Sequence, residues 1–177
     1  TPMAEAINYA LVSDLTLRKL TDRCNGVSNA AKQSAWKAQR TWWQRNGEMV
    51  EAADFGLSQV LVDVSGQRPE TGALVAIGLS ADISREAQSN VEGAMSGNQE
   101  KSCQNVMDDY YNGEYDLKDD SGYYSVLVKL HQQKQAASEV PVLSIATPKG
   151  GKRAYGKSAA VVEKIVKREG CVKPKIQ

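Results

Sequence analysis

A seven-residue repeat in the middle of the chain constrains the fold more than any other feature. Trp36, Trp43, Val50, Leu57 and Val64 fall seven residues apart. Apolar side chains at this spacing lie on one face of an α-helix, and we expect this face, with Trp36 and Trp43, to pack in the core. The repeat predicts one long helix over about 29–64, capped by Ser28 or Asn29. Gly47 and Gly56 each cost roughly 1 kcal/mol relative to Ala, so a break near either glycine is the alternative.

Shorter apolar patterns predict helices on both sides of this segment. Ile7, Leu11 and Leu15 recur every four residues after Pro2, which suits the first turn of a helix. Spacing of four also runs from Val75 to Met95. The further helices that we expect cover about 2–24, 70–95, a short segment with Cys103 and Met107, 122–137 and 158–169.

These elements predict an all-α fold, an antiparallel bundle of about five to six helices with an irregular, partly extended C-terminal section. The 177 residues are of a size for one domain, 1–177. Residues 140–146 are β-branched and include Pro141, which disfavours helix. We therefore expect 138–157 to form an irregular strap or arm.

Composition is ordinary for a globular protein and selects no partner by itself. The net charge is +1, with 41% hydrophobic and 24% charged residues. No apolar run approaches the roughly 18 residues that a membrane-spanning helix needs. The sequence predicts no membrane span and leaves peripheral contact with a membrane open.

Residues 151–158 read Gly-x-x-x-x-Gly-Lys-Ser, the pattern of a phosphate-binding P-loop. A P-loop belongs to a parallel sheet, in which each crossover takes a dozen residues or more. Only 19 residues follow Ser158, enough for one helix and a tail. We expect no nucleotide cofactor, and interpret Ser158 as the cap of the last helix.

Two segments of opposite charge could bind a partner. Residues 149–177 hold nine Lys or Arg and two Glu, whereas residues 100–120 hold seven acids and two bases. The basic residues that we single out for partner binding are Lys149, Lys152, Arg153 and Lys157. An acidic protein surface, anionic lipid or nucleic acid is a suitable partner for these residues. The segment contains no recognisable nucleic-acid-binding motif.

Neither catalysis nor metal binding has a clear signature. His131 is the only histidine, and its neighbours form no catalytic motif. The acidic loop 108–120 does not follow the EF-hand pattern, because Lys118, Ser121 and Leu127 stand where that pattern needs an acid or amide, a Gly and a Glu. We predict no catalytic residue, no metal and no cofactor. A small hydrolase using His131 or this loop is an alternative.

Cys24, Cys103 and Cys171 are too far apart for a typical zinc site. Cys24 and Cys103 each lie at the end or first turn of an expected helix, so we predict a Cys24–Cys103 disulfide with Cys171 left over. Thr1 as the first residue is consistent with removal of a signal peptide, or with a cloning remnant. We expect a periplasmic or secreted protein, with the cytoplasm as the alternative.

Trp42 lies about 100° around the helix from Trp43 and therefore at the edge of the apolar stripe or outside it. An exposed Trp42 beside Arg45 would resemble a binding hot spot. The alternative is that Trp42 packs beneath a neighbouring helix. We predict a non-catalytic, exported helical protein that binds another protein, as an inhibitor, immunity factor or envelope adaptor. Nucleotide or nucleic-acid binding through loop 149–158 is a second alternative.

Overall fold

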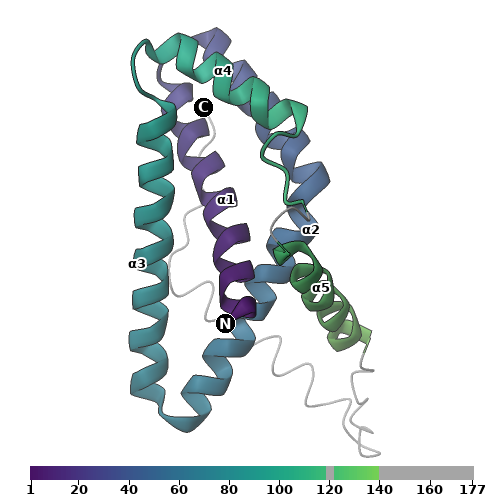
Figure 1. Ribbon diagram of the computed structural model, residues 1–177. Helices are drawn as coiled ribbons and strands as arrows, with labels where there is room; N and C mark the ends of the chain where they lie inside the picture. The colour runs from purple at the N-terminus through teal and green to yellow at the C-terminus, as the bar shows by residue number, and fades with distance from the viewer. Residues whose placement is uncertain (119–121, 140–177) are drawn as a thin grey trace, which may run out of the picture. The chain divides into compact units, whose positions relative to one another are not determined.

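The computed structural model describes residues 1–118 and 122–139, which form five α-helices and no strand (Figure 1). The predicted all-α bundle is confirmed. The helix expected at 158–169 lies outside the described residues, as do residues 140–157 of the expected strap or arm. The last described residues, 138 and 139, still belong to a helix.

The helix bounds match the predicted ranges to within a few residues. Helix α1 spans Pro2–Asn25, α2 Asn29–Gln67, α3 Pro69–Ala94, α4 Gln99–Asn112 and α5 Tyr123–Glu139. Ser28 caps α2, because its hydroxyl oxygen accepts a hydrogen bond from the Ala31 backbone N–H at 3.1 Å. Helix α2 continues through Gly47 and Gly56, so the alternative of a break is wrong.

The other four helices all pack against α2, the longest one. Helix α1 also lies along α3, and α5 also contacts α1 (Figure 1). Only Arg68, in an extended conformation, separates α2 from α3. Leu17, Leu20, Leu127 and Leu130 are among the core side chains that these contacts bury.

The buried stripe of α2 differs from the predicted one. It includes Ala31, Ala35, Ala38, Trp42, Asn46, Met49, Ala53 and Gly56, which follow one another in steps of three or four residues. Of the predicted heptad, only Val50 is buried; Trp43, Leu57 and Val64 are half-buried. Trp36 is 52% exposed, so its assignment to the core is wrong. Small side chains define the true stripe because they let neighbouring helices approach closely.

Helix geometry explains this correction. A straight α-helix has 3.6 residues per turn, so positions seven apart rotate by about 20° at each step. Four such steps separate Trp36 from Val64, and they carry the pattern about 80° around α2. The apolar repeat therefore leaves the buried face toward its N-terminal end, where Trp36 faces solvent.

Cys24 and Cys103 are fully buried, and their sulfur atoms lie at disulfide-bonding distance. Their Cα atoms are 5.7 Å apart, within the range for a disulfide. The predicted pairing is confirmed, and it links the end of α1 to the first turns of α4. Among the described residues, no helix is both long and apolar enough to span a membrane.

Candidate functional site

Trp42 is fully buried, which contradicts its predicted role as an exposed partner-binding residue. Its indole N–H donates to the Tyr115 carbonyl at 3.0 Å, and its ring meets the edge of the Tyr110 ring at 6.4 Å between centroids. The alternative interpretation, that Trp42 packs beneath a neighbouring element, is confirmed. Its position in the alanine-rich stripe, which the apolar heptad concealed, explains the error.

Arg45 is already paired within the protein. Its guanidinium donates to both carboxylate oxygens of Asp116, at 2.8 and 3.1 Å, and to the Tyr110 carbonyl at 2.8 Å. Asn46 completes this network, because its amide donates to Asp116 and its carbonyl accepts the Leu117 backbone N–H, each at 2.8 Å. Arg45 therefore holds the chain after α4 against α2. This role differs from the predicted one in partner binding.

The other predicted binding residues, Lys149, Lys152, Arg153 and Lys157, lie outside the described residues. The same holds for the whole of loop 149–158 and for Asp119 and Asp120 of the acidic loop. Their predicted roles stay predictions.

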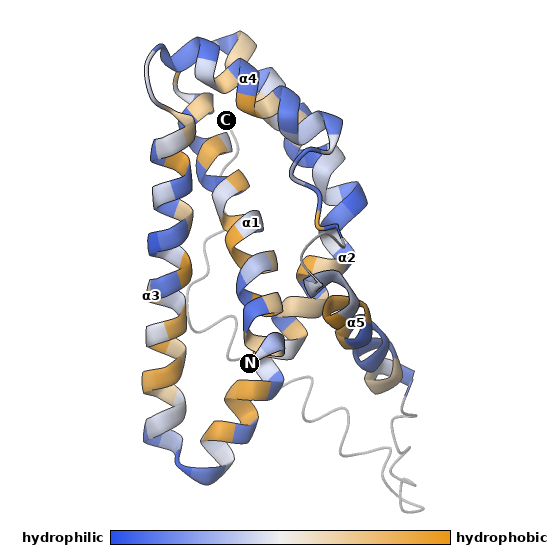
Figure 2. Cartoon of the chain, viewed as in Figure 1, coloured by the Kyte–Doolittle hydropathy of each residue, from blue (hydrophilic) through white to orange (hydrophobic). Residues whose placement is uncertain are grey.

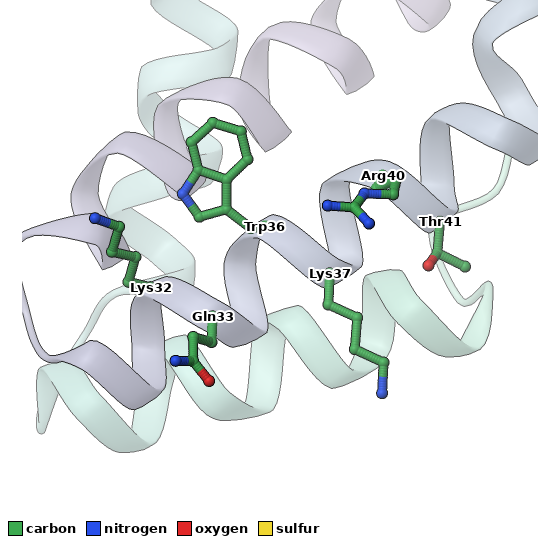
Figure 3. A pocket seen from close by; sticks show the side chains of 6 residues that line it. All are labelled: Lys32, Gln33, Trp36, Lys37, Arg40 and Thr41. Atoms are coloured by element: carbon green, nitrogen blue, oxygen red, sulfur yellow. The ribbon is translucent and has the colours of Figure 1, made fainter.

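The exposed tryptophan of α2 is Trp36, and positive side chains surround it. Lys32 and Arg40 lie one turn before and one turn after Trp36, whose ring extends away from the helix (Figure 3). Lys37, Gln33 and Thr41 complete a shallow groove of about 420 Å³. We call this surface, Lys32, Gln33, Trp36, Lys37, Arg40 and Thr41, the Trp36 face.

No ion pair among the described residues compensates the positive charge of the Trp36 face. Lys32, Lys37 and Arg40 take part in none of the ion pairs found between described residues. Lys37 places its ammonium 4.4 Å from the centroid of the Tyr111 ring, a cation–π contact that orients the side chain and keeps its charge. Lys32 and Arg40 beside one exposed aromatic ring, with Lys37 on the adjoining side of the helix, favour an anionic partner with an apolar contact.

A charge count would have located this face in the sequence. Residues 24–47 contain Lys32, Lys37, Arg40 and Arg45 and no Asp or Glu. The apolar repeat drew attention away from this run, because it placed Trp36 in the core. When the rotation of about 20° per heptad is taken into account, Trp36 is expected outside the core, on the same part of the helix surface as these basic residues.

The residues considered for catalysis do not come together. His131 is half-buried on α5, with Nε2 4.0 Å from a carboxylate oxygen of Glu48. Its Nδ1 is buried and has no hydrogen-bond partner among the described residues. No hydroxyl or thiol of the described chain hydrogen-bonds to this imidazole. Among residues 1–118 and 122–139, no cluster of three or more His, Cys, Asp or Glu side chains is arranged to hold a metal ion.

Two carboxyl groups have a raised pKa, for structural reasons. Burial raises the pKa of Asp14, although Arg18 and the Trp43 N–H lower it in part. Burial also raises the pKa of Asp54, again against the effect of Arg18. Asp14 lies between α1 and α2, where its partners already use both oxygens.

Comparison with protein-family models, with curated proteins and with solved structures found no match. The fold and the surface define the class of protein: an all-α bundle whose longest helix carries a basic face around an exposed tryptophan.

Proposed function

We propose that this protein is a non-catalytic binding protein that docks the Trp36 face of α2 onto an acidic surface of another protein. The observation that carries the proposal is Trp36, 52% exposed and flanked by Lys32, Lys37 and Arg40, none of them paired within the described bundle. Tryptophan and arginine are the residues most enriched in binding hot spots.

The chemistry of the face favours an acidic protein over other anions. Its groove is mostly apolar around one ring, and burying a tryptophan supplies binding energy that phosphate contacts alone lack. Unpaired lysine and arginine side chains attract an acidic partner over a distance and raise the association rate. Gln33 and Thr41 offer hydrogen bonds at the rim.

An inhibitor, an immunity factor or an envelope adaptor would work in this way, and we propose a role of this kind outside the cytoplasm. Support for export comes from Cys24 and Cys103, since disulfides persist mainly in oxidising compartments. Hydrolysis through His131 and nucleotide or nucleic-acid binding through loop 149–158 remain the alternative proposals.

A photo-crosslinking residue in place of Gln33 tests the proposal while leaving Trp36 intact. The same residue at Lys129, an exposed position on α5, is the control. A protein that crosslinks at position 33 alone would be identified by mass spectrometry, purified and titrated by calorimetry. We expect a patch of Asp and Glu residues at its crosslinked site.

Matched substitutions then connect the affinity to the face. We expect Trp36→Ala to weaken binding about 30-fold, equivalent to about 2 kcal/mol. Leu74→Ala, which shortens another exposed apolar side chain, should have no effect. Lys32→Glu with Arg40→Glu should slow association and reduce its salt dependence, whereas Lys129→Glu should not.

Several outcomes would contradict the proposal. One is a crosslinked protein whose affinity is unchanged by Trp36→Ala. Another is a partner of a different class: single-stranded DNA or phosphatidylserine vesicles that bind the wild type and lose binding in Trp36→Ala. The latter result would reassign the face to nucleic acid or to a membrane surface.

A further inference from the structure

A second surface hollow lies where α1, α3 and α4 meet the chain that follows α4. It has a volume of about 580 Å³ and shares no residue with the Trp36 face. Tyr9 and Ser13 of α1, Asn90 of α3, and Tyr110, Glu114 and Tyr115 are among its lining residues. A small organic molecule fits a volume of this size.

Tyr110 is a buried aromatic residue in the lining of this cleft. The residue is only 4% exposed, and its hydroxyl makes none of the hydrogen bonds found within the described part of the chain. Burial raises the pKa of this phenol, so it stays neutral and available as a donor.

The aromatic part of the cleft is held in place. The Tyr110 and Tyr115 rings lie 4.6 Å apart between centroids, and Trp42 packs edge-on against Tyr110. The Trp42 N–H fixes the backbone of Tyr115, while Arg45 fixes Asp116 beside it. Tyr115, which is 47% exposed, therefore stands in a defined position at one end of the cleft, with the buried Tyr110 packed against it.

The charges at the cleft are negative. Its lining contains Glu114 and Asp116 and no Lys, Arg or His. Arg45 neutralises Asp116, whereas Glu114 has no ion pair within the described helices and loops. The pKa of Tyr115 is raised by burial and also by the negative charges of Asp109 and Glu114, which shows the sign of the potential at this ring.

We propose that this cleft binds a small organic cation of the alkylammonium class, with Glu114 as its counter-ion and the exposed ring of Tyr115 against its charged end. Tyrosine faces attract cations through the ring quadrupole, most strongly for quaternary ammonium groups. The Tyr110 hydroxyl supplies a hydrogen bond to a polar tail. This proposal is independent of the one for the Trp36 face.

Choline and its uncharged isostere 3,3-dimethyl-1-butanol are the probes, compared by calorimetry on the full chain. They share shape and hydroxyl group and differ only in the charge of the quaternary centre. We expect saturable binding of choline with a Kd on the order of 1 mM or tighter, and binding of the isostere about tenfold weaker. Equal binding of the two would overturn the proposal, as would the absence of binding by choline.

Variants locate the bound cation. Glu114→Gln should weaken choline binding about fivefold or more and leave the isostere unchanged. Asp108→Asn, which removes an exposed charge on α4 outside the lining, is the matched control. Tyr115→Leu should remove the preference for choline over the isostere, with the helical circular dichroism spectrum unchanged. A preference that survives both Glu114→Gln and Tyr115→Leu places the cation elsewhere and contradicts the assignment.

Discussion

Asp14 is an ionisable residue inside the bundle, only 3% exposed. One oxygen accepts the Trp43 indole N–H at 3.0 Å, and the other pairs with Arg18 at 2.7 Å. These partners favour the ionised form, but the loss of hydration outweighs them and raises the pKa of Asp14 above 3.8. A charge held in this way lowers the stability of the fold at neutral pH.

We therefore expect Asp14→Asn to stabilise the protein at pH 7, by about 1 kcal/mol. The Asn carbonyl keeps the bond to Trp43, and the lost pair with the largely exposed Arg18 contributes little. The pKa of Asp14 is higher in the folded state than its ordinary value of 3.8. The contribution of protonated Asp14 to stability is therefore fully present below pH 3.8 and is lost as the pH rises through the folded-state pKa. The advantage of the variant should thus shrink as pH falls from 7 toward 4.

Urea unfolding followed by circular dichroism at the two pH values measures this change. Asp22→Asn, at an exposed position of α1, is the control and should shift stability by no more than about 0.5 kcal/mol. A variant that is less stable than the wild type at pH 7 would show that the Arg18 pair outweighs the loss of hydration.

At the scale of elements, the sequence was sufficient to place the helices, because the apolar spacing, Pro2 and Ser28 mark their faces and starts. It was not sufficient to place the buried face of α2. Alanine, glycine and Asn46 carry little hydrophobic signal, yet they form the stripe on which α2 packs. The network of Arg45 and Asn46 with Asp116 joins residues about 70 positions apart, and no local pattern encodes such contacts.

Two glycines of α3 allow a matched test of how closely α2 and α3 approach. A Cβ atom at Gly72 would collide with the side chain of Ser65 on α2 and would lie 3.1 Å from the Ser65 Cα. A Cβ atom at Gly78 would have no neighbour within 4 Å. Gly78→Ala should stabilise the protein by about 0.5–1 kcal/mol through helix propensity. Gly72→Ala gains the same propensity but must push the helices apart.

We therefore expect Gly72→Ala to be no more stable than the wild type and less stable than Gly78→Ala by at least about 0.5 kcal/mol. Thermal unfolding of both variants measures the difference. Equal stabilisation by the two substitutions would mean that α2 and α3 can separate at the Arg68 turn at little cost in free energy. The close approach of Gly72 to Ser65 would then have no consequence for stability.

At the scale of the whole molecule, burial is uneven. The fully buried positions of α2 end at Gly56, and beyond them the α2–α3 hairpin exposes Val62, Leu74 and Ile77, each by 65–70%. Figure 2 shows hydrophobic residues on both helices near their connection. Only Asp63, Arg68 and Glu70 are charged between Asp54 and Asp82. The well-packed part of the bundle is therefore the end that carries the Trp36 face and the Cys24–Cys103 pair.

Loss of the Cys24–Cys103 bond should weaken the whole bundle. The two residues are 79 positions apart, and a loop of that size gives a disulfide a stabilising effect of about 4 kcal/mol, within a usual range of 2–5. We expect the variant with Cys24→Ser and Cys103→Ser to lose this amount in urea unfolding. Cys171→Ser should leave stability unchanged. The oxidised wild type should show one thiol under denaturing conditions, and three would contradict the bond.

The Cys24–Cys103 bond encloses all of α2 and α3, and this matters wherever proteases are present. A single cut between the two cysteines produces two fragments that stay covalently joined, so a nicked molecule runs as one species on a gel until it is reduced. The amino-terminal fragment keeps Cys24, and any cut beyond position 40 leaves it carrying Trp36 with its three flanking cations. The bridge thus keeps the fragment with this surface attached to the rest of the protein after the exposed hairpin is clipped.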